Sequence, residues 1–348
     1  MRKIYFIRHA HPDIPLDERW CLGSGADLPL NNLGKLQGRI LAEAFRDIPL
    51  AGVYSSTMIR ARQTAAYLSK DYVVFQGLEE IYMGCWDGLP FSQIMEQYPE
   101  DYAKREADRS IQPPGAESIE AAKERFSRAV TLILALTQGD IAIVAHAGIL
   151  SFFFGQKLAH TAYMVTDEKM NILEGPILPH VELSPELCRS LREEIGLLPH
   201  ISQHCDAVAE EALKYCDALE TVGVPMNRAL VEQASLLHDI VRLEKNHEEL
   251  GGRYLSKLGY PDIGDVIRQH CSPDAEIINE AAVLFMADKN IREDAHVSVE
   301  ERFGAVYRKC ESLNLLSDSF LEAYHRRLNE ALRFKELFNR TCGQELVK

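Results

Sequence analysis

The sequence lacks the signatures of membrane and secreted proteins. No apolar run approaches the roughly 20 residues that a membrane-spanning helix needs. The longest candidate, residues 141–154, is interrupted by His146 and Gly148. The N-terminal residues also lack a secretory apolar segment, because Arg8 and His9 end the first apolar run. We therefore expect a cytoplasmic location and no membrane partner.

Paired cysteines and an excess of basic charge are also missing. The eight cysteines are scattered without a Cys-x-x-Cys pair, which argues against a zinc ribbon or a disulfide framework. The formal net charge is −14, whereas binding a nucleic-acid backbone requires a basic face. We expect no nucleic-acid partner. A locally basic pocket for a small anionic substrate remains compatible with this charge.

The two halves of the chain differ in pattern. Domains usually hold roughly 100–200 residues, so a chain of 348 residues favours two of them. Apolar runs typical of buried strands gather in residues 1–175, which predicts an α/β domain. Helical periodicity dominates residues 198–345, which predicts an all-α helical bundle. Residues 176–197 are dense in Pro and Gly and are predicted to be a linker.

The first predicted strand ends in a pair of residues suited to anion chemistry. Residues 4–7 are four consecutive apolar residues, which is typical of a strand buried on both faces of a parallel or mixed sheet. Arg8 and His9 follow at the carboxyl end of this strand, where open α/β sheets bind their ligands. An arginine can clamp anionic oxygens, and a neighbouring histidine can attack or transfer a proton.

A second strand leads into a helix that carries two arginines. Residues 51–54 are predicted to form this strand, and Ser56 is positioned to cap the following helix. That helix contains Arg60 and Arg62. Residues two apart on a helix do not share a face, so we expect at most one of the two to face a site.

Further chemistry-bearing residues lie near other strand ends. Residues 141–145 form another buried apolar run, and it ends at His146 before a Gly-containing turn. Glu79 and Glu80 bring a pair of carboxylates to a loop punctuated by Gly84. A histidine and a carboxylate in reach of an anion site are suited to proton transfer. The residues alone do not decide between the two glutamates.

In their order and spacing, these motifs resemble the histidine phosphatase (phosphoglycerate mutase-like) superfamily. The segment from residue 88 to 118 is similar to the alpha-ribazole phosphatase branch. The resemblance covers residues 1 to about 155 and implies a three-layer sandwich with a mostly parallel central sheet. It rests on Arg8-His9-Ala10, Ser55-Ser56 with Arg60 to Ala65, Glu80 with Gly84, Trp86 and Gly88, and Val144 to Gly148.

The resemblance also implies roles for five residues. His9 would be the nucleophile that accepts a phosphoryl group. Arg8, Arg60 and His146 would bind the phosphate oxygens and stabilise the charge in transfer. Glu80, which spacing favours over Glu79, would be the general acid and then the base. No cofactor would be needed for this metal-independent phosphomonoesterase.

Some residues depart from the family's pattern or fall outside it. Ala10 replaces the usual Gly after the nucleophile, and Pro15 replaces a frequent Asn, which puts one phosphate contact in doubt. His11, His160 and His180 belong to none of these motifs, so we expect them at the surface. Residues 96–110 carry charges of both signs rather than a basic lid, which favours a phosphatase over a mutase.

The second half concentrates histidine and aspartate, the ligands that suit zinc, iron or manganese. His238 and Asp239 follow an apolar helix face. The pattern resembles the HD superfamily of metal-dependent phosphohydrolases over residues 198 to about 310. The resemblance implies one or two divalent ions (Fe, Mn or Zn), with Asp239 as a bridge if there are two. The core ligands would be His204, His238, Asp239 and Asp288, and the extra ligands of two-metal members would be His247 and His270.

The combined interpretation is a bifunctional phosphohydrolase. One domain would hydrolyse phosphomonoesters through a phosphohistidine, and the other would hydrolyse phosphoesters or phosphoanhydrides with a metal. The substrates would be small phosphorylated metabolites or nucleotides, and the two sites could act in sequence. The alternative is a phosphatase that is regulated by a non-catalytic HD domain acting as a metal or ligand sensor.

Overall fold

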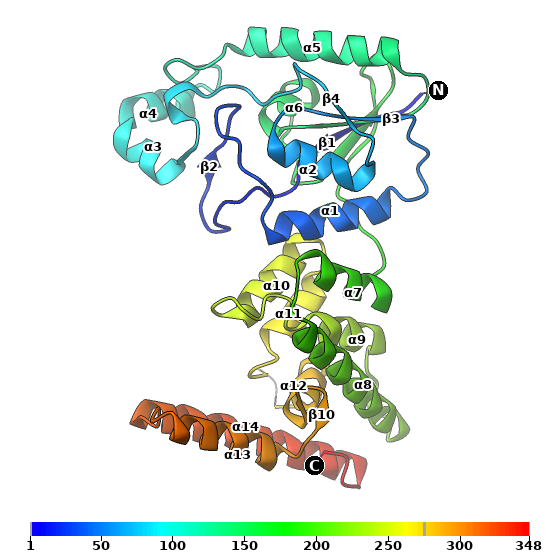
Figure 1. The fold of residues 1–348 in the computed structure, drawn as a ribbon, viewed down its shortest axis with the longest axis vertical. Helices are drawn as coiled ribbons and strands as arrows, with labels where there is room; N and C mark the ends of the chain where they lie inside the picture. The colour runs from blue at the N-terminus through cyan, green and yellow to red at the C-terminus, as the bar shows by residue number, and fades with distance from the viewer. Residues whose placement is uncertain (1, 274–275, 348) are drawn as a thin grey trace. The chain divides into compact units, whose positions relative to one another are not determined.

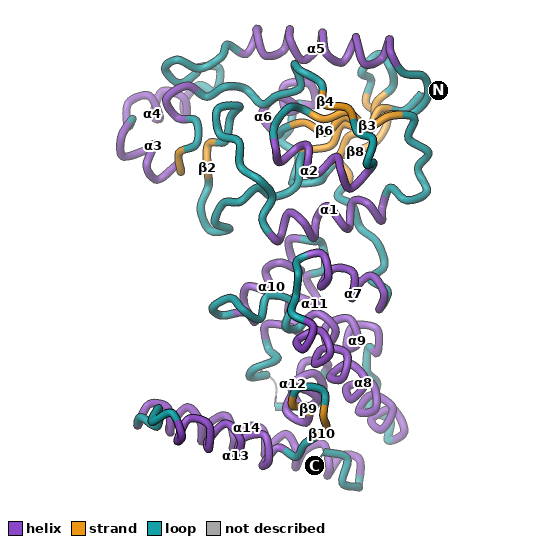
Figure 2. Tube along the Cα trace, viewed as in Figure 1, coloured by secondary structure: helices purple, strands orange, loops and turns teal. Residues whose placement is uncertain are grey.

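The computed structural model describes residues 2–273 and 276–347 and divides the chain into two compact units. The boundary lies between Val181 and Glu182. Strands dominate the centre of the first unit, and helices make up nearly all of the second (Figure 2). None of the helices in the described part of the chain is both long and apolar enough to cross a membrane.

The first unit is built on a six-stranded sheet with the order β4-β3-β6-β1-β7-β8. β1, β3, β4 and β6 run parallel, while β7 is antiparallel to both β1 and β8. The carboxyl ends of the parallel strands therefore meet at one edge. The strands are β1 (Ile4–Arg8), β3 (Gly52–Ser55), β4 (Val73–Val74), β6 (Ile141–Ala145), β7 (Tyr163–Thr166) and β8 (Ile172–Ile177).

Helices cover both faces of this sheet and complete three layers (Figure 1). Alternate residues of a strand point to opposite faces. Ile4 and Phe6 of β1 pack in one core cluster with α5 (Ile119–Leu136) and α6 (Ala147–Phe154). Tyr5 and Ile7 pack in the other with α1 (Asn32–Ala44) and α2 (Ile59–Leu68). The predicted α/β sandwich with a mostly parallel sheet is confirmed.

A small subdomain of the first unit is formed by chain segments that connect the strands of the sheet. It contains β2 (Trp20–Cys21), η1 (Gly84–Trp86), β5 (Leu89–Pro90), α3 (Phe91–Gln97) and α4 (Pro99–Ala107). Its core surrounds the buried Trp86. Gly84 has a φ of +59°, and a Cβ there would lie 2.1 Å from the carbonyl oxygen of Pro114. Only glycine fits this close approach between two loops.

The second unit is a helical bundle around α12, as predicted (Figure 2). Nine of the eleven residues of α12 are buried, which agrees with a helix packed on several sides. Among the described residues of this unit, the strands form one short hairpin of β9 with β10. Its elements are α7 (Pro185–Glu194), α8 (Pro199–Thr221), α9 (Arg228–Leu237), α10 (His247–Lys257), α11 (Pro261–Arg268), α12 (Glu280–Asn290), β9 (Ile291–Arg292), β10 (Ala295–His296), α13 (Val299–Ser312) and α14 (Asp318–Cys342).

The structure differs from the linker predicted over residues 176–197. β8 continues to Ile177, and α7 packs against α9 inside the second unit. Leu187, Cys188 and Leu191 are buried on the inner face of α7. Its proline is the first helical residue and follows a Ser cap, and in that position proline starts a helix instead of breaking one. The sequence already shows this helix start at Ser184 and Pro185, but the linker prediction failed to assign the helix to the second unit.

Candidate active site and candidate metal centre

The register of the sheet brings three polar residues to one edge. β1 and β3 both pair with β6, and each of the three strands is followed by a polar residue, namely His9, Ser56 and His146. The ring centroids of His9 and His146 lie 5.1 Å apart. The Ser56 hydroxyl Oγ lies 2.7 Å from Nε2 of His146 and fixes the orientation of that ring.

The surroundings of His9 keep its imidazole neutral and leave its Nε2 unprotonated. Its Nδ1 lies 2.7 Å from the carbonyl oxygen of Ala10, which can only accept, so Nδ1 carries the proton and Nε2 keeps its lone pair. The side chain is only 5% exposed. Burial and the nearby Arg60, His146 and Arg8 lower the pKa of His9 well below 6.5. The ring is therefore neutral at pH 7.

Two guanidinium groups adjoin this imidazole, that of the buried Arg60 and that of the half-buried Arg8. Arg60, in the first turn of α2, donates to the carbonyl oxygens of Ala26 at 2.6 Å and Gly23 at 3.0 Å. Arg8 donates to the carbonyl oxygen of Leu158 at 2.8 Å, and burial lowers its pKa to about 10, so it stays charged at neutral pH. The Nε atoms of both have no hydrogen-bond partner among the described residues. This leaves donors for an anion.

The Glu80 carboxylate is held at the start of α6. It accepts hydrogen bonds from the backbone N–H groups of Gly148 at 2.7 Å, Ile149 at 2.8 Å and Ile81 at 3.0 Å. The first two belong to the first turn of α6, where the helix dipole favours a negative charge. A Cβ on Gly148 would lie 2.7–2.9 Å from the carboxylate. Glu80 therefore depends on glycine at this position.

The structure shows which member of two residue pairs, Arg60 with Arg62 and Glu79 with Glu80, lies near His9 or His146. Arg60 is fully buried beside His9, whereas Arg62 is exposed. Glu79 turns away from the strand ends, because its Oε1 accepts from the hydroxyl of Thr57 at 2.9 Å. Only Glu80 of the two lies against the turn that begins with His146.

The expectation that His11 and His160 lie at the surface is wrong. His11 is only 7% exposed, and His160 is half-buried, with ring centroids 4.7 Å from His11 and 5.6 Å from His9. Nε2 of His160 accepts a hydrogen bond from Nη2 of Arg8 at 2.7 Å. The reason is topological: β7 is antiparallel to β1, so the loop before β7 returns to the same edge. His180 is exposed, as expected.

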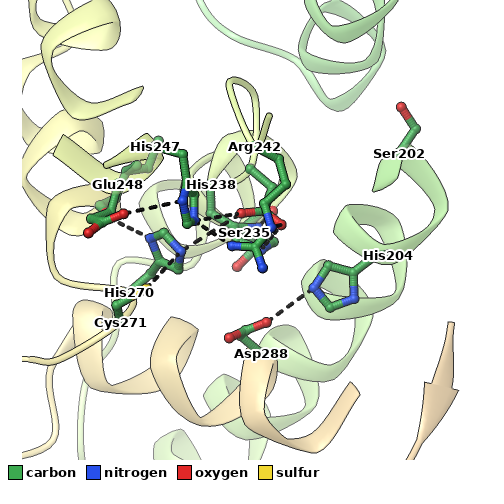
Figure 3. Close-up of polar contacts among 12 residues, drawn as sticks. Ser202, His204, Ser235, His238, Arg242, His247, Glu248, His270, Cys271 and Asp288 are labelled. Atoms are coloured by element: carbon green, nitrogen blue, oxygen red, sulfur yellow. Dashed lines mark hydrogen bonds and ion pairs between the residues drawn. The ribbon is translucent and has the colours of Figure 1, made fainter. Parts of the chain in front are cut away.

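The six candidate metal ligands of the second unit converge from five helical segments (Figure 3). His204, His238 and Asp239 offer ligand atoms within 4.8 Å of one another. His247 and His270 form a second such group, together with the cysteine at position 271. They come from α8 (His204), the end of α9 (His238, Asp239), the start of α10 (His247), the residue pair after α11 (His270) and α12 (Asp288).

Hydrogen bonds orient the imidazoles in the manner of metal ligands. The Nδ1 atoms of His204, His238 and His270 lie 2.9, 2.8 and 2.7 Å from backbone carbonyl oxygens, which can only accept. Each Nδ1 therefore carries a proton, and each Nε2 is directed toward a carboxylate, that of Asp288 for His204 and that of Asp239 for the other two. A partner on the outer nitrogen is the usual support of a metal-binding histidine. The carbonyls belong to Glu293, Ser235 and Ile267 respectively.

Asp239 lies between the two groups. Its Oδ2 is 3.6 Å from Nε2 of His238, and its Oδ1 is 3.3 Å and 3.8 Å from Nε2 of His247 and His270. Burial alone would raise the pKa of Asp239, but His238, His247 and Arg242 hold it well below its ordinary value. The carboxylate is thus ionised, with one oxygen directed to each group.

The remaining core ligands also suit a cation. Burial lowers the pKa of His238 to about 4, so it is neutral at pH 7, and its Nε2 has no hydrogen-bond partner in the described part of the chain. Asp288 is 3.1 Å from Nε2 of His204 and is held by Arg302 at 3.0 Å and Lys289 at 2.6 Å. Four imidazoles and two carboxylates, arranged in two adjacent groups, fit the coordination chemistry of zinc, iron or manganese.

Comparisons with known proteins match one family to each part of the chain. The sequence model of the histidine phosphatase superfamily (branch 1) matches residues 4–165, and that of the HD domain matches residues 201–292. The chain thus carries a histidine phosphatase domain and an HD domain. The relatives of the first are phosphatases, and the HD family comprises phosphohydrolases.

Several named proteins are similar to the histidine phosphatase domain. A 6-phosphofructo-2-kinase/fructose-2,6-bisphosphatase of Caenorhabditis elegans is 28% identical over 47% of this chain and 36% of its own length. A bifunctional protein of Mycobacterium tuberculosis is 32% identical over 41% of each chain. The chain spans less than half the length of these relatives. The alpha-ribazole phosphatase structure from Shigella flexneri has 22% identity and a TM-score of 0.44, covering 52% of this chain and 100% of that one.

Proposed function

We propose that the protein is a bifunctional phosphohydrolase whose first unit hydrolyses a phosphomonoester through a phosphohistidine on His9. One observation carries this proposal: a neutral imidazole with a free Nε2 lies near two charged guanidinium groups at the sheet edge, those of the buried Arg60 and the half-buried Arg8. A neutral nitrogen is a nucleophile, and fixed positive charges stabilise the transferring phosphoryl group.

In the first step, Nε2 of His9 attacks phosphorus and the bond to the ester oxygen breaks. Arg8 and Arg60 bind the phosphoryl oxygens through their free N–H groups. His146, held by Ser56, contacts the same oxygens. Glu80 enters this step protonated and gives its proton to the departing oxygen, which leaves as an alcohol, so that Glu80 becomes a carboxylate. The products are phosphohistidine and the dephosphorylated substrate.

In the second step, water attacks the phosphohistidine. Glu80, now a carboxylate fixed by three backbone N–H groups, takes the proton from water. The N–P bond breaks, inorganic phosphate leaves, and His9 returns to its neutral form. Splitting one difficult displacement into two easier ones is the advantage of covalent catalysis.

The substrate class that fits best is a small phosphorylated metabolite or nucleotide. The subdomain that includes α3 and α4 contributes a segment, residues 84–118, of the kind that roofs a small pocket. Some of the related proteins, such as that of Caenorhabditis elegans, are named 6-phosphofructo-2-kinase/fructose-2,6-bisphosphatase. Residues 96–110 mix both charge signs, which supports a phosphatase rather than a mutase that must retain its product.

The test of the first site uses p-nitrophenyl phosphate. The wild-type protein should hydrolyse it with EDTA present, and His9→Ala should abolish turnover and acid-labile labelling of the protein. His180→Ala, which changes an exposed histidine, should leave the rate unchanged. Activity that disappears with the chelator but survives in His9→Ala would contradict the assignment.

The second unit is proposed to be a metal-dependent phosphohydrolase. The observation that carries it is the orientation of the four imidazole Nε2 atoms toward two ionised carboxylates, His204 toward Asp288 and the other three toward Asp239. His204, His238 and Asp288 would hold one ion and His247 with His270 a second, with Asp239 shared. A bound divalent ion polarises phosphate oxygens and provides hydroxide at neutral pH. Lys289 and Arg302 keep Asp288 charged and in place.

A sensor role is the alternative for this unit. The presence of six oriented candidate ligands favours catalysis, because a degenerate site would have no need of them. Elemental analysis combined with a screen of phosphodiesters and phosphoanhydrides separates the two roles. We expect bound metal and hydrolysis in the wild-type protein, with both lost in His238→Ala. Metal binding without turnover of any such substrate would favour the sensor.

A further inference from the structure

A cysteine adjoins the second group of ligands, and the proposed function does not use it. Cys271 follows His270 directly, and its Sγ lies 3.5 Å from Nε2 of that histidine. That Nε2 is the nitrogen directed inward, since Nδ1 is engaged by the carbonyl oxygen of Ile267. One ligating atom from each of His247, His270 and Cys271 lies within 4.8 Å of the others. Figure 3 shows Cys271 beside His270 at the edge of the cluster.

The distances match those between ligands of one tetrahedral ion. With metal–nitrogen bonds of about 2.0–2.1 Å and metal–sulfur bonds of about 2.3 Å, neighbouring ligand atoms lie roughly 3.3–3.6 Å apart. The sulfur of Cys271 is 3.5 Å from Nε2 of His270. Oδ1 of Asp239 is 3.3 Å and 3.8 Å from Nε2 of His247 and His270. Two of these three distances lie within that range and the third is 0.2 Å longer, so the four atoms are spaced nearly as in a coordination shell.

The neighbours of His247 support the same position. Nδ1 of His247 lies 3.2 Å from Oε2 of Glu248, which orients the ring as a supporting carboxylate does in metal sites. Nη1 of Arg242 is 2.6 Å from Nε2 of His247, and Nε of Arg242 is 3.6 Å from Oδ2 of Asp239. Nε2 of His247 thus lies against both a donor, Arg242, and an acceptor, Oδ1 of Asp239. The positively charged guanidinium of Arg242 therefore contacts two of the candidate ligands, His247 and Asp239.

We propose that Cys271 is a thiolate ligand of the second metal ion, in a site formed with His247, His270 and the shared Asp239. This inference rests on the proposed metal centre and specifies its second position. Soft thiolate ligands select zinc or iron over manganese, which prefers oxygen. The second position is therefore a zinc- or iron-selective site, while the first, with only imidazole and carboxylate ligands, is more permissive.

Cobalt(II) provides the test, because a thiolate bound to cobalt gives a charge-transfer absorption band that imidazole and carboxylate do not. The full-length protein is stripped with chelator and titrated with Co²⁺. We expect the wild type to bind two ions and to show the band with one of them. Cys271→Ser should lose the band while visible d–d absorption of cobalt remains. Cys310→Ser, which changes another partly exposed cysteine of the same unit, should keep it.

The possible results separate the cysteine from the metal centre as a whole. Cobalt d–d absorption without a charge-transfer band in the wild type would overturn the role of Cys271 and leave the metal centre standing. A band that persists in Cys271→Ser would overturn it equally. No cobalt absorption in the wild type would overturn the metal centre itself. Cobalt absorption that is unchanged in His238→Ala would overturn it too.

Competition between metals gives a second measurement. Loss of a group that only orients a ligand weakens metal binding by roughly 10–100-fold, so loss of a direct ligand should weaken zinc binding at the second position by at least about tenfold. Manganese binding should change much less, because manganese gains little from sulfur. Equal losses for zinc and manganese in Cys271→Ser would contradict thiolate ligation.

Discussion

His9 can act as a nucleophile only while its imidazole is neutral. Burial and the positive charges around it lower its pKa well below 6.5, so the neutral form persists as the pH falls from 7.5 to 6.5. We expect the single-turnover rate of enzyme phosphorylation to stay constant over this range. Rapid-quench measurements with two substrates that differ in phosphate pKa separate ionisation of the substrate from that of His9. A rate that is halved near pH 6.5 with both substrates would contradict a neutral, shielded His9.

His160 positions the guanidinium of Arg8 through the hydrogen bond to Nη2. Hydrogen bonds to charged groups contribute about 1.5–3 kcal/mol, and 1.4 kcal/mol corresponds to a tenfold change. We therefore expect His160→Ala to lower kcat/KM for p-nitrophenyl phosphate by roughly tenfold or more and to weaken inhibition by inorganic phosphate.

A conservative variant distinguishes positioning from general damage. His160→Gln keeps an acceptor for Arg8 and should recover part of the lost affinity for phosphate. His180→Ala should behave as the wild type. If His160→Gln is as impaired as His160→Ala, the hydrogen bond to Arg8 is not what His160 contributes.

Much of the candidate phosphate site could be predicted because strand ends are visible in sequence. Apolar runs that stop at His9 and at His146 place both residues at one edge of a parallel sheet. His160 could not be found this way, because it precedes β7, a short antiparallel strand whose pairing with β1 is a long-range contact. Cys271 was missed for a different reason: a single thiol beside a histidine has no spacing pattern of its own.

The first turn of α6 holds the carboxylate of Glu80 in place. Gly148 lies in the first turn of this helix, and a Cβ there would press on the Glu80 carboxylate. Because the carboxylate is the end of a flexible side chain, it can move away at small cost to folding. In a helix, alanine is favoured over glycine by about 1 kcal/mol.

Gly148→Ala should therefore separate stability from activity. We expect an unchanged or higher Tm, together with a loss of kcat of about 100-fold, the lower range for general acid–base catalysis. Thermal unfolding by circular dichroism and steady-state kinetics on the same preparation check both values. Full activity in Gly148→Ala would show that Glu80 does not need its contacts with α6.

Helix α7 shows the limit of composition as a guide to elements. Proline and glycine around it favour a linker, yet the same proline occupies the first turn of a helix whose inner face is buried. Local composition reports which residues can break a helix, whereas burial against α9 depends on residues more than forty positions away. The existence of the helical bundle followed from periodicity, but its first boundary did not.

The two units have separate cores and separate candidate sites, so each reaction should be lost independently. We expect His9→Ala to lose hydrolysis of p-nitrophenyl phosphate while keeping metal content and hydrolysis of an HD substrate. His238→Ala should show the reverse. Assays of both full-length variants, with and without chelator, measure this separation.

If the sites act in sequence, His9→Ala should also accumulate a phosphomonoester from the HD substrate. Loss of phosphatase activity in a folded His238→Ala would instead favour the HD domain as a regulator of the phosphatase.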